Sequence, residues 1–133
     1  MKRTRVLIID DEESLTRLLK RNLERVGRFE VRTENSALDA VAAATEFGPE
    51  VILLDVMMPG MDGGEIAVDL REVPALRRVP IVFLTAAVTP EEVTRNDGFI
   101  AGFQYLAKPV DLDPLVEAID RALRGSGPAG SQG

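Results

Sequence analysis

The sequence predicts an α/β fold in which a doubly wound, parallel sheet of five strands has helices on both faces. Continuous apolar runs recur at residues 6–9, 51–54 and 79–84, and a run without alternating polar residues is typical of a strand buried on both faces. Between these runs, apolar residues recur at spacings of three and four, the period of an amphipathic helix. The alternation of strands and helices favours a parallel sheet in a (βα)5 arrangement.

Composition narrows the class of protein. The chain has 133 residues, 45% hydrophobic and 29% charged, which fits one globular domain. It has no histidine or cysteine, which excludes disulfides, a Cys/His zinc site and a Ser-His or Cys-His nucleophile pair. A net charge of −6 argues against a direct nucleic-acid surface. The sequence shows neither a signal peptide nor a membrane-spanning run, so we expect a cytoplasmic protein without membrane contact.

Two βα units are expected before the central strand. Residues 6–9 form the first strand, and the helix that follows ends at Gly27. Residues 29–33 alternate between apolar and polar, which predicts an edge strand. Ser36 is expected to cap the second helix, which ends at residues 48–49. The third strand, residues 51–54, then runs directly into Asp55.

The second half continues the alternation, with one irregular unit. A third helix runs to about residue 72, and the strand at residues 79–84 ends in Thr85. The fourth helix is predicted to be short or irregular, because residues 96–98 break it and residues 99–102 replace its second half. Residues 103–107 form the last strand, followed by Lys108 and a final helix. We expect a domain over residues 1–124 and a disordered tail or linker over residues 125–133.

Polar side chains stand where four predicted strands end: Asp10, Asp11 and Glu12, then Asp55, Thr85 and Lys108. The carboxyl ends of parallel strands share one edge of a sheet, so these side chains should converge. Clustered carboxylates repel one another, and a hard cation such as Mg²⁺ resolves the repulsion. A lysine and a hydroxyl beside them would complete a phosphoryl-transfer site, in which an aspartate can be the nucleophile.

These residues closely resemble the receiver domain of two-component response regulators, of the chemotaxis type with a flavodoxin-like fold. The resemblance covers about residues 4–124 and is carried by residues 6–12, 53–63, 84–86 and 105–109. It implies the strand order 2-1-3-4-5. It also implies that Asp55 is the phosphoacceptor of a phosphorelay, taking a phosphoryl group from a sensor histidine kinase or a phosphotransfer protein. A surface would then switch its binding of a downstream protein.

The resemblance also implies the Mg²⁺ ligands. Asp11 and Asp55 would bind the cation directly, together with the backbone carbonyl of Met57. Asp10 would hold a water molecule bound to the metal.

The remaining roles implied by the resemblance concern the phosphoryl group and the response to it. Lys108 would pair with the phosphoryl oxygens, and the Thr85 hydroxyl would donate a hydrogen bond to one of them. Tyr105 would turn inward as Thr85 moves, so that both act as a switch. The Lys108–Pro109 bond would be cis. Residues 88–102 depart from the family pattern, and we expect them to be mobile and partner-specific.

Three other interpretations compete with this one. The chain could be a pseudo-receiver that binds partners without being phosphorylated, although such modules typically lack the acceptor, an acidic partner or the lysine. An aspartate-nucleophile phosphatase would have Asp-x-Asp where this chain has Met57 two residues after Asp55, so we do not expect an enzyme. A nucleotide fold would need a phosphate-binding loop where the acidic run begins at Asp10. The chain could be a single-domain regulator or a fragment of a longer protein.

Overall fold

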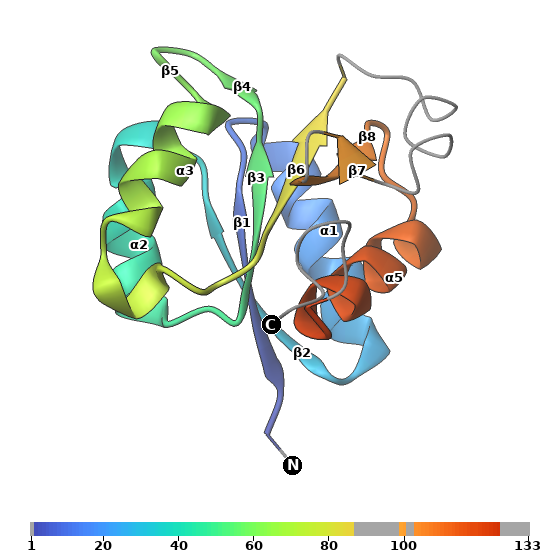
Figure 1. Cartoon of the computed structure of the whole chain (residues 1–133). Coiled ribbons are helices and arrows are strands. Elements are labelled where there is room, and N and C mark those ends of the chain that lie inside the picture. Colours follow the sequence, from blue (N-terminus) through green and yellow to red (C-terminus); the bar gives the residue numbers. More distant parts are fainter. Residues whose placement is uncertain (1, 87–98, 101–102, 126–133) are drawn as a thin grey trace.

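A parallel sheet forms the centre of the computed structural model, which describes residues 2–86, 99–100 and 103–125 (Figure 1). The sheet has the order β2-β1-β3-β6-β8-β7. The first five of these run parallel, which confirms the predicted doubly wound fold and its strand order. In chain order they are β1 (Thr4–Ile9), β2 (Phe29–Glu34), β3 (Val51–Asp55), β6 (Ile81–Thr85) and β8 (Phe103–Ala107).

Three short strands were not predicted. β7 (Phe99–Ile100) pairs antiparallel with β8 at the edge of the sheet, where the sequence had suggested an irregular segment. β4 (Met57–Met58) and β5 (Met61–Asp62) form a separate antiparallel pair directly after β3. The start of the fourth helix, most of the segment expected to be mobile and the tail after Gly125 lie outside the described residues.

Helices cover both faces of the sheet. α1 (Glu13–Val26) and α5 (Leu112–Leu123) lie on one face, and α2 (Ala40–Phe47) and α3 (Gly63–Arg71) lie on the other (Figure 1). Alternate residues of each central strand point to opposite cores: Leu53 packs with the α1/α5 side and Leu54 with the α2/α3 side. This two-sided burial explains why the strands are continuous apolar runs. None of the helices in the described ranges has the length and apolarity that a membrane crossing requires.

The helix ends show which local signals were correct. Gly27 follows α1 with a φ of 97°, the left-handed conformation that favours glycine. α3 begins with a capping box in which Asp62 accepts from the Glu65 N–H at 2.9 Å. The expected Ser36 cap was wrong: a 3₁₀ turn (Ala37–Asp39) precedes α2, and the hydroxyl makes no capping hydrogen bond. The Ser36 N–H instead donates to Glu34 Oε2 at 3.1 Å.

The strand register brings the predicted polar residues to one edge of the sheet. Adjacent strands are aligned near their carboxyl ends, where the register partners are Ile9 with Leu54, Asp55 with Leu84, and Thr85 with Ala107. The residues that follow β1 and β8 therefore emerge beside the end of β3. This alignment places a group of charged side chains around Asp55.

Candidate functional site

Three carboxylates meet at the carboxyl edge of the sheet, as predicted. One oxygen from each of Asp10, Asp11 and Asp55 lies within 4.8 Å of the others. Asp10 follows β1 and is fully buried, whereas Asp55 ends β3 and is 4% exposed. Asp11 is exposed, so the cluster is open to solvent on its side. Two buried carboxylates beside a third are unfavourable unless positive charge balances them.

The carboxyl group of Asp55 reflects this environment. Burial and the adjacent Asp10 charge raise its pKa from 3.8 to about 6. A hydrogen bond from the Met57 N–H to Asp55 Oδ1 at 3.2 Å and the charge of Lys108 oppose the shift. With a pKa of about 6, the group is still mostly ionised at neutral pH.

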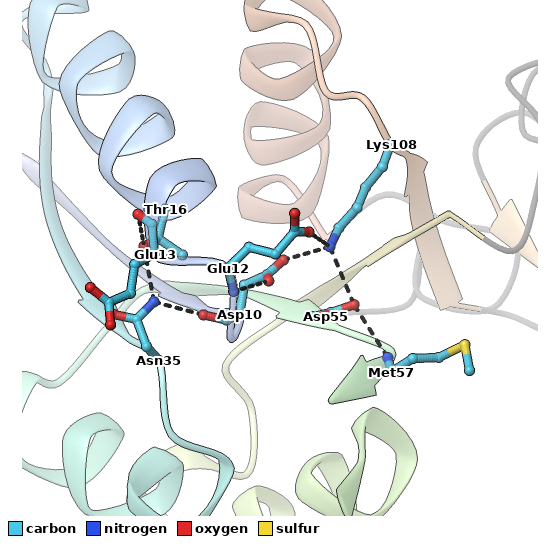
Figure 2. Close-up of polar contacts among 8 residues, drawn as sticks. All are labelled: Asp10, Glu12, Glu13, Thr16, Asn35, Asp55, Met57 and Lys108. Carbon is cyan, nitrogen blue, oxygen red and sulfur yellow. Dashed lines mark hydrogen bonds and ion pairs between the residues drawn. The ribbon is translucent and has the colours of Figure 1, made fainter. Parts of the chain in front are cut away.

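Lys108 supplies the positive charge (Figure 2). Its Nζ lies 2.8 Å from Asp10 Oδ2, 2.9 Å from Glu12 Oε1 and 3.6 Å from Asp55 Oδ1. Burial alone would lower the pKa of Lys108, but the contacts with Asp10 and Glu12 outweigh it and raise the pKa. The backbone N–H of Lys108 donates to the carbonyl of Thr85 at 2.9 Å, which ties β8 to β6. The Lys108–Pro109 bond is cis, as the resemblance implied.

The other three predicted residues lie at or near the same edge. Thr85 ends β6 and is buried. The N–H of Met57 contacts Asp55, and its side chain is 69% exposed; the proposed ligand role of its carbonyl stays a prediction. Tyr105 is half-buried, and its ring stacks on Phe83 with the centroids 5.2 Å apart. Its movement with Thr85 likewise stays a prediction.

Three residues of the site were assigned no role from the sequence. Glu12 was noted only as part of an acidic run, but its side chain pairs with Lys108 and its N–H donates to Asp10 Oδ1 at 2.9 Å. Asn35 donates a hydrogen bond to the backbone carbonyl of Asp10 at 2.7 Å. The available signal for Asn35 was its position, since a polar residue directly after the second strand falls at the same edge.

The third residue without an assigned role is Gly63, at the start of α3. A Cβ at this position would lie 2.7 Å from the backbone oxygen of Asp55 and 2.9 Å from the Cα of Val56. The N–H of Gly63 donates to the Val56 carbonyl at 2.6 Å. Only glycine permits this approach of helix to strand, and α3 thereby begins directly against the residue that carries the Asp55 carboxylate.

The donor set fits a hard divalent cation. All three groups of the cluster offer carboxylate oxygens, the ligands that Mg²⁺ prefers. Asp10 Oδ2 is balanced by its contact with the Lys108 ammonium at 2.8 Å. A cation beside Asp11 and Asp55 would relieve the remaining repulsion.

Comparison with known protein families assigns the chain to one of them. The family model for the response regulator receiver domain matches residues 6–120. The chain belongs to the response regulator receiver domain family. Receiver domains are signalling domains of two-component systems, and they bind Mg²⁺ at an acidic pocket. In this receiver domain the corresponding acidic group is Asp10, Asp11 and Asp55.

Relatives and solved structures agree with this assignment. The receiver domain is 39% identical over 120 residues to the transcriptional regulatory protein SrrA of Staphylococcus aureus, covering 90% of this chain and 47% of that protein. It is 35% identical over 128 residues to YkoG of Bacillus subtilis, an uncharacterised transcriptional regulatory protein, covering 96% of this chain and 54% of that protein. The chain therefore spans about half the length of these relatives.

Two crystal structures illustrate the likeness of fold. The chemotaxis protein CheY4 of Vibrio cholerae has a TM-score of 0.77 and 29% identity, covering 91% of this chain and 99% of that one. A response regulator from Desulfuromonas acetoxidans has a TM-score of 0.73 and 26% identity, covering 91% of this chain and 97% of that one. Both matches extend over nearly the whole receiver domain, so the family assignment covers the sheet and the acidic site together.

Proposed function

We propose that this receiver domain accepts a phosphoryl group on Asp55, from the phosphohistidine of a sensor kinase or a phosphotransfer protein, in the cytoplasm. The observation that carries the proposal is the convergence of Lys108, which follows β8, with the adjacent carboxylates of Asp10 and Asp11 after β1 and the carboxylate of Asp55 at the end of β3. Lys108 lies 3.6 Å from Asp55 and has little exposure, so its charge acts in a partly desolvated site. Such a charge stabilises a transferring phosphoryl group more strongly than it would in water.

The reaction needs an ionised Asp55. A carboxylate oxygen of Asp55 attacks phosphorus, a P–O bond forms, and the P–N bond to the histidine breaks. The imidazole nitrogen keeps the electron pair of that bond. Because the pKa of Asp55 is about 6, the nucleophile is available at neutral pH. A group with a pKa just below the working pH combines availability with nucleophilicity.

The surrounding residues would manage the charge of the phosphoryl group. Lys108 pairs with its oxygens, and the Thr85 hydroxyl donates a hydrogen bond to one of them. Asp10, Asp11 and Asp55 would hold Mg²⁺, with the Met57 carbonyl as a further ligand. When bound, Mg²⁺ neutralises negative charge on the transferring group.

Phosphorylation would be reported through Thr85 and Tyr105. The ring of Tyr105 stacks on Phe83, which lies two residues before Thr85 on β6. A movement of Thr85 would therefore shift the strand against which the ring packs. Phe103 also contacts Phe83, in an edge-to-face arrangement with the ring centroids 5.5 Å apart. A protein partner that binds beside Tyr105 would then distinguish the phosphorylated from the unphosphorylated state of Asp55.

The test is phosphorylation of the purified chain by acetyl phosphate with Mg²⁺, followed by intact-mass measurement. Wild type should gain the mass of one phosphoryl group, and Asp55→Asn should gain none. Asp39→Asn is the matched control, because Asp39 is an exposed aspartate with no side-chain capping bond. A gain that survives in Asp55→Asn contradicts the assignment, and no gain in wild type favours a phosphorylation-independent interaction module.

A further inference from the structure

Asn35 joins the end of β2 to the loop that carries the acidic residues (Figure 2). Its Nδ2 donates to the backbone carbonyl of Asp10 at 2.7 Å and to Thr16 Oγ1 at 3.0 Å. A side-chain amide has two N–H donors, and these contacts use both. The carbonyl of Asp10 belongs to the peptide group that links Asp10 to Asp11. A hydrogen bond to it therefore restrains the orientation of both acidic residues.

Thr16 extends the connection into α1. Its side chain is buried, and its hydroxyl both accepts from Asn35 and donates to the carbonyl of Glu13 at 3.1 Å. The N–H of Thr16 donates to the carbonyl of Glu12 at 3.0 Å. Asn35 therefore restrains the loop between β1 and α1 at Asp10, and Thr16 restrains it at Glu12.

Within the β1–α1 loop, the Glu12 N–H donates to Asp10 Oδ1 at 2.9 Å, but the first turn of α1 has no side-chain cap. Glu12 occupies the N-cap position of α1, but its side chain makes no capping hydrogen bond and turns to Lys108 instead. Residues at this position commonly fix the first turn with a side-chain oxygen. The carboxylates of Asp10 and Asp55 also repel each other across the site. The hydrogen bond from Asn35, directly after β2, to the Asp10 carbonyl adds a restraint from outside the loop.

We propose that Asn35 is a positioning residue for cation binding, acting through the Asp10–Asp11 peptide group. The inference rests on the proposed function, and it adds a residue that contacts neither cation nor phosphoryl group. Residues that orient metal ligands typically change metal affinity by about 10- to 100-fold when removed. Asn35 would hold the β1–α1 loop in the arrangement that the cation requires, so that less reorganisation accompanies binding.

The experiment measures Mg²⁺ binding to the full chain by isothermal titration calorimetry. In Asn35→Ala we expect the dissociation constant for Mg²⁺ to rise about tenfold. The Mg²⁺ concentration that gives half-maximal phosphorylation by acetyl phosphate should rise with it, while the rate at saturating Mg²⁺ stays close to that of wild type. A purely structural role would lower the melting temperature without producing this separation of affinity from rate.

Matched variants keep the inference falsifiable. Ser36→Ala, at the adjacent residue, should bind Mg²⁺ as wild type does, because the Ser36 hydroxyl makes no capping bond. Thr16→Val should weaken binding as Asn35→Ala does, whereas Thr16→Ser, which keeps the hydroxyl, should not. The Thr16 pair decides the question if Asn35→Ala fails to fold. Unchanged affinity in a folded Asn35→Ala, or an equal loss in Ser36→Ala, overturns the inference; a wild type that binds no Mg²⁺ overturns the proposed function instead.

Discussion

The ammonium of Lys108 lies closer to Glu12 than to Asp55, at 2.9 Å from Glu12 Oε1 and 3.6 Å from Asp55 Oδ1. The residue that should serve the phosphoryl group is therefore held partly by a neighbouring carboxylate. Glu12 and a phosphoryl group on Asp55 would therefore compete for the ammonium group of Lys108.

Glu12→Gln should accelerate phosphorylation. The variant removes the competing charge, but Glu12 is 56% exposed and its ion pair is screened by water. An exposed pair contributes about 0–1 kcal/mol, so the gain in rate should be no more than about fivefold. The measurement is the initial rate with acetyl phosphate at saturating Mg²⁺. Glu13→Gln, which changes an exposed glutamate one residue away, is the control, and a slower Glu12→Gln would show that Glu12 assists the reaction.

Lys108→Met should destabilise the metal-free protein. The variant leaves Asp10 fully buried without its ion-pair partner and removes the positive charge next to Asp55. Removing one partner of a buried ion pair typically lowers the free energy of unfolding by about 3–5 kcal/mol. The raised pKa of Lys108 keeps it charged at neutral pH, so the full effect should appear at pH 7 in urea unfolding. Unchanged stability would mean that solvent already screens the cluster.

The contribution of Asp55 to the stability of the metal-free protein should fall as the pH rises from about 4 to 6. The pKa of Asp55 is about 6 in the folded chain against 3.8 as the ordinary value. Between these values the folded state binds more protons than the unfolded state, so the free energy of unfolding falls as the pH rises. The contribution amounts to at most about 3 kcal/mol at pH 7. Urea unfolding in EDTA at several pH values should therefore show that the free energy of unfolding of wild type falls relative to that of Asp55→Asn between about pH 4 and 6, with Asp39→Asn as the control.

At pH 7 the same argument makes metal-free Asp55→Asn more stable than wild type. An asparagine carries no charge against Asp10, and burial of a neutral amide is less unfavourable than burial of a carboxylate. Added Mg²⁺ should stabilise wild type and have less effect on the variant. A metal-free Asp55→Asn that is less stable than wild type would contradict the electrostatic account.

Gly63→Ala should impair the site through the backbone. The new Cβ would lie 2.7 Å from the Asp55 carbonyl oxygen, so α3 or the end of β3 must shift. Overpacking of this kind typically lowers the free energy of unfolding by about 1–3 kcal/mol, and phosphorylation should slow as well. Gly64→Ala is the matched control, since its nearest neighbour is a side-chain oxygen of Asp62 at 3.2 Å and not a backbone atom, so a shift of a few tenths of an ångström relieves the contact. Equal effects of the two variants would contradict a specific role for Gly63.

Much of the fold could be predicted because burial on two faces leaves a direct mark in the sequence. The run that ends at Asp55 is apolar throughout, and all five residues of β3 are buried. The short strands β4, β5 and β7 could not be predicted in the same way. A two-residue strand is too short to show a period, and its pairing depends on tertiary contacts.

Some residues of the candidate site could be predicted from the sequence, and others could be found only from the structure. Asp10, Asp55 and Lys108 were predictable because parallel strands bring their carboxyl ends to one edge. The contact of Glu12 with Lys108 depends on a side-chain conformation, and the contact of Asn35 with the Asp10 carbonyl depends on the path of a loop. Neither leaves a periodic pattern, so the structure was needed to find them.

The most direct test of the central claim is to locate the phosphoryl group in the chain. Acetyl phosphate and Mg²⁺ are added to the wild-type protein, the acyl phosphate is reduced with borohydride, and the peptides are sequenced by mass spectrometry. The account predicts modification at Asp55 alone, dependent on Mg²⁺ and lost in Asp55→Asn. Modification at Asp10 or Asp11, or an unmodified chain under conditions in which Mg²⁺ binds, would contradict it.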